Sequence, residues 1–255
     1  MVSDMPNSPP PPKTLRARVV ARRMLAPRVL SLELAVESDA VFRYCAGQYI
    51  RIHLDDGRRR DLSIATPCEG NNLLETWVRD VGGDFSRYLF DQLEPGERWT
   101  LDGPLGNAWV RASDEPLLVI SGGTGLGPAR AIVRAELTRD PTRPIELIHG
   151  DTASTDLFAE EELEHWAREH PSFTYLPTLD NAEAQWSGHH GTPDKLLAAR
   201  HEDLQGWTAH VFGPPPMVEA VAPVLEARGI EREAIHADMF TPGASDLDRI
   251  YPPSG

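Results

Sequence analysis

The chain of 255 residues is poor in cysteine, with only Cys45 and Cys68. Two cysteines form at most one disulfide, which excludes a disulfide-stapled fold. They are also too few to hold, within this chain, an iron–sulfur cluster that needs four thiolates. None of the nine histidines shows a metal-ligand spacing, so no metal site is predicted. The adjacent pair His189-His190, which glycines flank, is predicted to be exposed in a loop.

Long apolar runs and an excess of positive charge are also missing. No run approaches the ~20 apolar residues that span a bilayer. The N-terminus, MVSDMPNSPPPPK, lacks the basic start and apolar core of a signal peptide, so a cytoplasmic location without a membrane is expected. Lys and Arg number 25 against 39 Asp and Glu, and the net charge of -14 would repel a phosphate backbone. Nucleic acid is therefore not an expected partner.

Short, partly alternating apolar segments fill the first half of the chain. Residues 1–13 are rich in proline and are predicted to form a disordered or polyproline tail. Strands are predicted within ARVVARRML, RVLSLELAV, QYIRIHL, RDLSIAT, LLETWVRD and RWTLDGPL, and a short helix within DFSRYLFDQL. Many short strands separated by turn signals indicate an antiparallel β-barrel domain over residues 14–112.

After Pro116 compact apolar strands alternate with helical patterns. The strands are PLLVIS, PIELIHG, FTYLPTL, AHVFG and AIHADMF, and helices such as GPARAIVRAEL and FAEEELEHWAREH lie between them. This alternation predicts an α/β domain with a doubly wound parallel sheet over residues 113–240, followed by an irregular tail at 241–255. Ligands of such sheets bind beyond the carboxyl ends of the strands.

Three consecutive arginines, Arg58 to Arg60, begin the segment RRRDLSIATP in this acidic chain. The triplet alone leaves two interpretations open, a solvated hairpin edge or an anion held against the strand. Arg58 or Arg59 is also a candidate to pair with Asp55 or Asp56 across the turn.

Glycine-rich stretches follow predicted strands at three places, VISGGTGLGPAR (119–130), FGPPPMVEA (212–220) and VRDVGGDFSRYL (78–89). Glycine lets the backbone approach a phosphate, and a helix N-terminus offers free N–H groups. Each stretch by itself is equally explained as a rigid turn.

Five short motifs nevertheless occur in a fixed order. They are Arg60-Asp61-Leu62-Ser63, Gly83-Asp84-Phe85-Ser86, Gly122 through Gly125, Phe212 through Met217, and Asp238-Met239-Phe240. Together they resemble R-x-Y-S, G-x-x-S, G-G-T-G, C-G-P-P-x-M and the acidic-x-aromatic ending of the ferredoxin–NADP reductase superfamily. The resemblance covers roughly residues 14–240 and is nearest to bacterial flavin reductases and the reductase components of oxygenases.

The resemblance implies FAD, or FMN as the alternative flavin, in the barrel and NAD(P)H on the α/β domain. Arg60 would neutralise the flavin phosphates, Ser63 would hydrogen-bond near flavin N5, and Asp238 would assist proton movement. The other cofactor-binding residues that it implies are Asp61, Leu62, Val78, Gly83, Asp84, Phe85, Ser86, Gly123, Thr124, Gly125, Asp151, Gly213, Pro214, Met217 and Phe240.

Three positions depart from the expected pattern. Leu62 replaces the aromatic residue that stacks on the flavin, so flavin is expected to be held more loosely. Phe212 replaces the cysteine near the nicotinamide, and its ring is expected to block hydride transfer or to fill the nicotinamide's space. Pro223 is expected to kink the last helix or delay its start.

The sequence thus predicts an NAD(P)H-dependent flavin oxidoreductase that passes electrons to a separate acceptor, namely an oxygenase, a ferredoxin, free flavin or oxygen. Whether flavin is tightly bound or diffusible stays open, and a regulatory nucleotide-binding module with little turnover is the alternative. NADH is expected over NADPH because Asp151 and Thr152 follow the second strand of the α/β domain. Arg130 or Arg134 is the alternative contact for a 2′-phosphate.

Overall fold

The computed structural model describes residues 8–54 and 57–240. Most of the proline-rich N-terminal tail, the pair Asp55 and Asp56, and the segment 241–255 lie outside the described residues. The predicted N-terminal tail therefore lies partly outside the described residues, and the predicted C-terminal tail lies wholly outside them. The predicted pairing of Arg58 or Arg59 involves Asp55 or Asp56, which are also outside. Within the described residues no helix has both the length and the apolarity that crossing a membrane requires.

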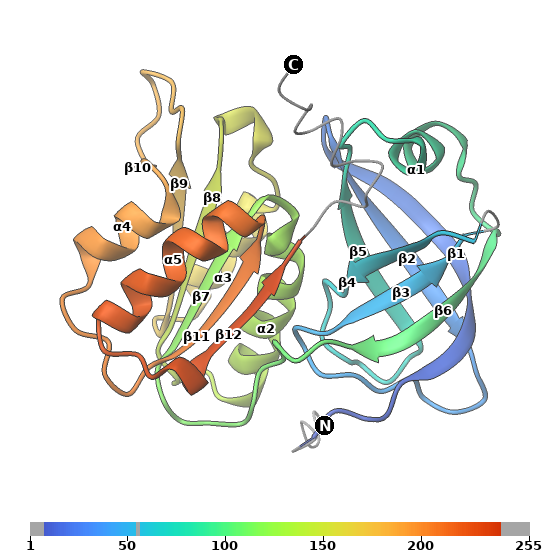
Figure 1. Cartoon of the computed structure of the whole chain (residues 1–255), viewed down its shortest axis with the longest axis horizontal. Helices are drawn as coiled ribbons and strands as arrows, with labels where there is room; N and C mark the ends of the chain where they lie inside the picture. Colours follow the sequence, from blue (N-terminus) through green and yellow to red (C-terminus); the bar gives the residue numbers. More distant parts are fainter. Residues whose placement is uncertain (1–7, 55–56, 241–255) are drawn as a thin grey trace.

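An antiparallel barrel forms the N-terminal half of the described chain (Figure 1). Its strands, in the order β4-β3-β6-β1-β2-β5, are β1 (Lys13–Ala26), β2 (Val29–Glu37), β3 (Tyr49–His53), β4 (Arg59–Ser63), β5 (Leu73–Arg79) and β6 (Arg98–Leu105). A bridge between Ile64 and Thr76 links the end of β4 to β5 and brings the two outer strands together. Alternation on β3 turns Ile50 and Ile52 into the barrel, where both are fully buried, so the predicted barrel is confirmed.

A short helical segment lies between β5 and β6. It consists of α1 (Asp84–Arg87) and a π-helical turn, η1 (Tyr88–Gln92). Arg22 of β1 holds this segment, because its guanidinium donates hydrogen bonds to the carbonyls of Leu89, Phe90 and Leu93 at 2.8–3.1 Å. These carbonyls are at the C-terminal end of the helical turns, where a positive charge is favourable.

The second half is a parallel sheet covered on both faces, as the alternation of strands and helices predicts. Its strand order is β10-β9-β8-β7-β11-β12. The strands are β7 (Leu117–Gly122), β8 (Ile145–Asp151), β9 (Phe173–Leu179), β10 (His189–His190), β11 (Thr208–Gly213) and β12 (Ile235–Met239). The chain goes from β7 outward on one side and returns through β11 on the other, so the topological switch lies between β7 and β11.

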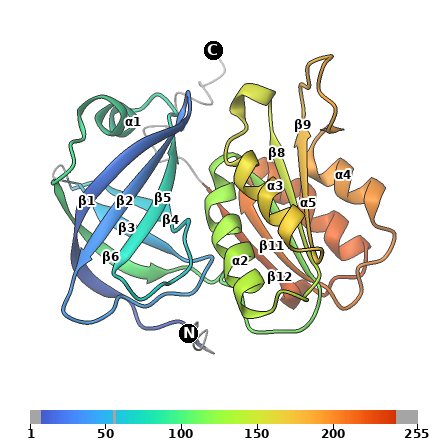
Figure 2. The same ribbon diagram turned by 180° about the vertical axis from the view of Figure 1, so that it is seen from behind.

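Helices α2 (Leu126–Arg139) and α3 (Glu160–Glu169) cover one face of this sheet, and α4 (Pro193–Arg200) and α5 (Pro215–Ala227) cover the other (Figure 2). Single 3-10 turns occur at η2 (Gly123–Gly125), η3 (Ser154–Asp156) and η4 (Arg232–Ala234). Pro223 lies inside α5, which begins at Pro215, so the expected delay of its start is wrong. His189 and His190 are exposed as expected but form a short edge strand on β9, because their backbone extends the parallel ladder.

The barrel and the parallel sheet share one buried apolar cluster. Ala65 and Trp77 of the barrel pack in it with Leu126 and Ala129 of α2 and with Phe212 of β11. Because protein interiors are packed as tightly as crystals, such a shared core holds the two halves in a defined relation. The surfaces on which the motifs lie are thereby brought face to face.

Candidate active site

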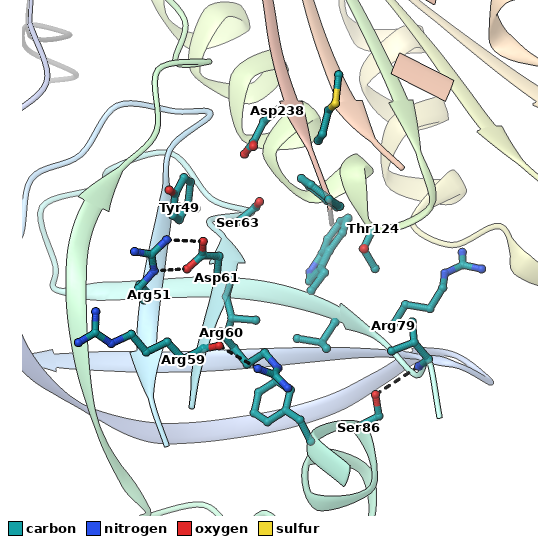
Figure 3. A pocket seen from close by; sticks show the side chains of 17 residues that line it. Tyr49, Arg51, Arg59, Arg60, Asp61, Ser63, Arg79, Ser86, Thr124 and Asp238 are labelled. Atoms are coloured by element: carbon teal, nitrogen blue, oxygen red, sulfur yellow. Dashed lines mark hydrogen bonds and ion pairs between the residues drawn. The ribbon is translucent and has the colours of Figure 1, made fainter. Parts of the chain in front are cut away.

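A cavity of about 500 Å³ opens where β4, β5 and α1 of the barrel meet the end of β12 and the turn after β7 (Figure 3). This volume is within the range of small-molecule sites. Its walls are formed by Tyr49, Arg51, Arg59, Arg60, Asp61, Leu62, Ser63, Trp77, Val78, Arg79, Val81, Phe85, Ser86, Thr124, Asp238, Met239 and Phe240. We call it the barrel cavity.

Strand β4 carries the arginine motif along the wall of the barrel cavity. Its alternation buries Leu62, whereas Arg59 and Asp61 on the opposite face are exposed. The Arg60 guanidinium lies 5.6 Å from the centre of the Phe85 ring and donates a hydrogen bond to the Arg59 carbonyl at 2.9 Å. A cation therefore stands on the cavity wall next to α1, where the second motif begins.

The loop before α1 is held to the helix by a hydrogen bond to a serine of the first turn. The Val81 N–H donates to Ser86 Oγ at 3.2 Å, and Ser86 is almost fully buried beside Phe85. Both side chains reach the barrel cavity. Gly83 caps α1 and Asp84 pairs with Arg87 on the surface, so neither of these two motif residues lines the cavity.

Two carboxylates, Asp61 and Asp238, line the other end of the barrel cavity. Asp61 forms a bidentate ion pair with Arg51 of the neighbouring strand at 2.6 and 2.8 Å. Asp238, at the end of β12, faces this pair and Tyr49 across the cavity (Figure 3). Burial, followed by the negative charge of Asp61, raises the pKa of Asp238 to about 6. A carboxyl that changes charge near neutral pH is suited to holding and releasing a proton.

The raised pKa of Asp238 predicts a pH-dependent stability difference between the wild type and Asp238→Asn. An acid whose pKa rises on folding binds its proton more tightly in the folded state. Protonated Asp238 is therefore compatible with folding, and the free energy of unfolding falls as pH rises from about 3.8 to about 6 and the carboxyl loses its proton. We expect Asp238→Asn to be more stable than the wild type by about 1–3 kcal/mol at pH 8. The difference should shrink below pH 5.

Urea unfolding of both proteins at pH 8 and pH 4.5 measures this effect. Subtracting the two curves removes groups that titrate equally in both proteins. A stability difference that is the same at both pH values would contradict the raised pKa.

A second cavity of about 680 Å³ lies at the carboxyl ends of β7, β8 and β11, at the topological switch. We call it the sheet cavity. It is lined by Arg79, Val81, Gly122, Gly123, Thr124, Gly150, Asp151, Thr152, Asp180, Thr192, Pro193, Asp194, Pro214, Pro215, Pro216, Met217, Glu219, Ala220 and Phe240. Arg79, Val81, Thr124 and Phe240 line both cavities, so the two are adjacent.

Two glycines allow the turns beneath the sheet cavity to pack against each other. A Cβ on Gly125 would lie 2.1 Å from the Phe212 carbonyl oxygen, and one on Gly122 would lie 2.6 Å from Met217 Sδ. The clash at Gly125 is with backbone and has no means of relief. A Cβ on Gly213 would likewise lie 2.7 Å from Met217 Cε. Gly125 and Gly213 thus serve the packing of the turns, and neither lines a cavity, whereas Gly123 and Thr124 do.

Asp151 ends β8 and lines the sheet cavity, but it is not a free charge. Arg79 of the barrel donates to it at 2.6 Å and also lies 3.7 Å from Asp156. Only 5% of the Asp151 side chain is exposed. Burial raises the pKa of Asp151, and the charge of Arg79 acts against that shift.

The structure therefore brings most of the candidate residues to two adjoining cavities. Those that line the barrel cavity are Arg60, Asp61, Leu62, Ser63, Val78, Phe85, Ser86, Thr124, Asp238 and Phe240, and those that line the sheet cavity are Gly123, Thr124, Asp151, Pro214, Met217 and Phe240. Gly83, Asp84, Gly125 and Gly213 line neither.

Sequence reasoning missed several side chains on these walls, among them Tyr49, Arg51, Trp77 and Arg79. Trp77 and Arg79 lie on the β5 strand just before the second motif. The period of two places both on one strand face. That signal was present in LLETWVRD, but nothing in it told which face meets the α/β half.

Two expectations about the nicotinamide side are wrong. Phe212 is fully buried in the core shared by the two halves and lines neither cavity, because β11 turns its side chain away from both. Arg130 is bound to Glu162 at 2.6 and 2.7 Å, and Arg134 to Glu69 at 2.6 Å. Neither arginine lines the sheet cavity, so they do not serve as alternative contacts for a 2′-phosphate.

Comparison with protein-family models assigns both halves. Residues 16–109 match the oxidoreductase FAD-binding domain, and residues 119–223 match the oxidoreductase NAD-binding domain. The chain belongs to the ferredoxin–NADP reductase superfamily. Its two halves thus correspond to an FAD-binding and an NAD-binding oxidoreductase domain.

Relatives of known activity are reductase components. The reductase subunit of an aromatic O-demethylase from Amycolatopsis sp. is 35% identical over 207 residues, which are 78% of this chain and 61% of the relative. The reductase component of phenol 2-monooxygenase from Pseudomonas sp. is 32% identical over 94% of this chain and 70% of its own length. The crystal structure of an Amycolatopsis cytochrome P450 reductase has a TM-score of 0.84 at 31% identity, over 91% of this chain and 71% of that one. The chain thus spans about two thirds of these relatives.

The residues of the two cavities fit the two groups that the superfamily binds. The barrel cavity has a guanidinium for phosphate at Arg60, hydroxyls at Ser63 and Ser86, and apolar walls at Leu62 and Val78 for a planar ring. The sheet cavity combines the backbone of a glycine turn with a wall of proline and methionine that suits a nucleotide base.

Proposed function

We propose that this protein is an NADH-dependent reductase that uses FAD to pass electrons to a separate acceptor. The observation that carries the proposal is the pair of adjoining cavities with a common boundary at Arg79, Val81, Thr124 and Phe240. A ligand in the sheet cavity can reach a ligand in the barrel cavity only at this boundary. The proposal follows the division suggested by sequence, with flavin on residues 14–112 and nicotinamide on residues 113–240.

Bound FAD supplies the acceptor for a hydride and the store for two electrons. The protein's part is to bind, orient and exclude water. Arg60 neutralises phosphate, and Arg22 keeps the α1 segment in place through the carbonyls of η1. Ser63 offers a hydroxyl on the barrel side of the boundary, and Thr124 offers one on the side of the glycine turn.

Proton handling is assigned to Asp238. It lies on the wall of the barrel cavity, which Ser63 also lines, and its pKa of about 6 lets it hold a proton below that pH and release it above. The Arg51–Asp61 pair faces it, and burial, followed by the negative charge of Asp61, favours its protonated form. Asp238 is thus suited to exchange a proton with a group in the cavity.

A separate electron acceptor is supported by the named roles of the relatives, which are reductase components of multi-protein oxygenase systems. The acceptor class proposed for this chain is an oxygenase or a ferredoxin. The alternatives are free flavin as a diffusible substrate, which Leu62 favours, and a nucleotide-binding module with little turnover.

The colour of the purified protein, followed by addition of NADH without oxygen, tests the proposal. A yellow protein whose absorbance near 450 nm is bleached by NADH supports bound FAD. A colourless protein that oxidises NADH only after flavin is added indicates a diffusible flavin. A protein that binds both nucleotides but never oxidises NADH would overturn the proposed activity in favour of the binding module.

The preference for NADH is supported by the charge of the sheet cavity. Of the described residues that line it, Asp151, Asp180, Asp194 and Glu219 carry carboxylates, and Arg79 carries a positive charge. Arg79 is already paired with Asp151. The 2′-phosphate of NADPH would bring further negative charge into an acidic cavity, whereas the ribose hydroxyl of NADH would donate to a carboxylate.

We therefore expect Asp151→Arg to shift the preference from NADH toward NADPH. Removing one carboxylate and adding a guanidinium should change the ratio of kcat/KM for the two cofactors by roughly fivefold or more, the equivalent of about 1 kcal/mol. Because Arg79 already neutralises part of the Asp151 charge, we expect the native carboxylate to discriminate against NADPH only weakly.

The measurement is kcat/KM for both cofactors at one ionic strength in the wild type, Asp151→Asn and Asp151→Arg. The asparagine variant separates loss of negative charge from gain of positive charge. If the wild type uses both cofactors equally well, or if the ratio is the same in all three proteins, the role of Asp151 in selectivity is refuted.

A further inference from the structure

Trp77 is an aromatic side chain on the wall of the barrel cavity that none of the recognised motifs contains. It is in β5, directly before Val78, and lines the cavity together with Ser63, Thr124 and Phe240. Only 6% of the residue is exposed, and it is part of the core shared by the two halves. The indole therefore lies where the barrel meets the glycine turn after β7.

The indole is held from several sides. Its N–H donates to Glu75 Oε1 at 2.8 Å, and its ring meets Phe158 edge to face with centroids 5.4 Å apart. The guanidinium of Arg130 lies 5.3 Å from the ring centre. Arg130 is itself tied to the barrel by a 2.8 Å hydrogen bond to the Ala65 carbonyl. A side chain that is already immobile loses little entropy when a ligand binds against it.

The neighbouring motif position does not provide such a ring. Leu62 is aliphatic, is 6% exposed, and packs in the apolar core of the barrel. The other aromatic residues of the cavity wall are Phe85 beside Arg60, Tyr49 near Asp61, and Phe240 after β12, which is only partly buried. Trp77 is almost fully buried and differs from the other aromatic residues of the cavity wall in being held by Glu75, Phe158 and Arg130.

We propose that Trp77 contacts the isoalloxazine ring and supplies the aromatic wall that Leu62 does not. This inference rests on the proposed binding of FAD in the barrel cavity. A contacting aromatic ring adds affinity for a planar ligand beyond the area it buries. It also has a spectroscopic consequence, because an electron-rich indole in contact with a flavin quenches the flavin's fluorescence, and a phenyl ring does not.

Titration of the full chain with FAD tests the inference in the wild type, Trp77→Phe, Trp77→Leu and the matched control Trp166→Phe. Trp166 also packs against Arg130, at 5.9 Å, but does not line the cavity. We expect bound FAD to emit several-fold more strongly in both Trp77 variants than in the wild type. The FAD dissociation constant should rise about three- to tenfold in Trp77→Leu. Trp166→Phe should change neither quantity.

The outcomes separate the inference from the proposed function. Wild-type protein that binds FAD, with emission and affinity unchanged in both Trp77 variants, overturns the role of Trp77 and leaves the flavin proposal intact. A wild type that binds no FAD overturns both. Trp77→Phe keeps a ring in the shared core, so its emission decides the question if circular dichroism shows that Trp77→Leu is unfolded.

Discussion

Replacing Arg60 with alanine is expected to raise the dissociation constant of FAD by an order of magnitude or more. Arg60 lines the barrel cavity beside Phe85 and is the motif cation of an otherwise acidic chain. A charge-assisted hydrogen bond to phosphate contributes roughly 1.5–3 kcal/mol, which corresponds to a factor of about 10 to 150. The measurement is a titration of the FAD-free protein, followed by the change of flavin absorbance.

Arg59 provides the matched control, since it also lines the barrel cavity but lies on the exposed face of β4. We expect Arg59→Ala to change FAD affinity by less than about threefold, the scale of an exposed charge. Equal losses of FAD affinity in the two variants would mean that the summed positive charge of the cavity, and not Arg60 in particular, attracts the flavin phosphates. An unchanged dissociation constant in Arg60→Ala would refute its assignment as the phosphate contact.

Replacing Arg143 with methionine is expected to destabilise the protein by about 3 kcal/mol. Arg143 pairs with Glu136 of α2, and both side chains are almost completely buried. Arg143 also donates to the Glu115 carbonyl at 2.7 Å. Removing one partner of a buried ion pair leaves a buried charge without compensation and typically costs about 3–5 kcal/mol. Arg139, which remains 2.9 Å from Glu136, keeps the expected cost at the lower end.

Urea unfolding at pH 7 measures this loss, and the Arg134–Glu69 pair gives the control. Arg134 lies on α2, as Glu136 does, but its pair with Glu69 is exposed. The exposed fractions of the Arg134 and Glu69 side chains are 40% and 43%. We expect Arg134→Met to cost less than about 1 kcal/mol. If the two variants lose the same stability, burial does not distinguish the two pairs and the argument fails.

The sequence alone determined the order and type of the elements. Alternation in QYIRIHL and the compact apolar run LLVIS of β7 are local signals, because a strand with one buried face needs a period of two and a doubly covered strand needs a continuous apolar run. The glycine-rich turn after β7 was also predicted, but that a side chain is excluded at Gly122 and Gly125 is shown only by the structure. Arg60 and Ser63 were found because their motif is contiguous.

Contacts between distant segments decided the rest. Arg79 meets Asp151 from 72 residues away, which changes Asp151 from a free charge into half of an ion pair. The pKa of Asp238 depends on its burial and on Asp61 of another strand. Neither partner is visible in the local sequence, because burial and charge pairing arise only when the two halves pack together.

The side to which a strand residue points was also a tertiary outcome. Phe212 and Trp77 both pack in the shared core, but only Trp77 also reaches the wall of the barrel cavity. A period of two says which residues share a face, but the neighbouring strands and helices decide which face meets the ligand. Most residues within the motifs were therefore placed on the cavity walls correctly, whereas Gly83, Asp84, Gly125 and Gly213 were not, and the walls between the motifs were set by the packing of the barrel against α2 and β11.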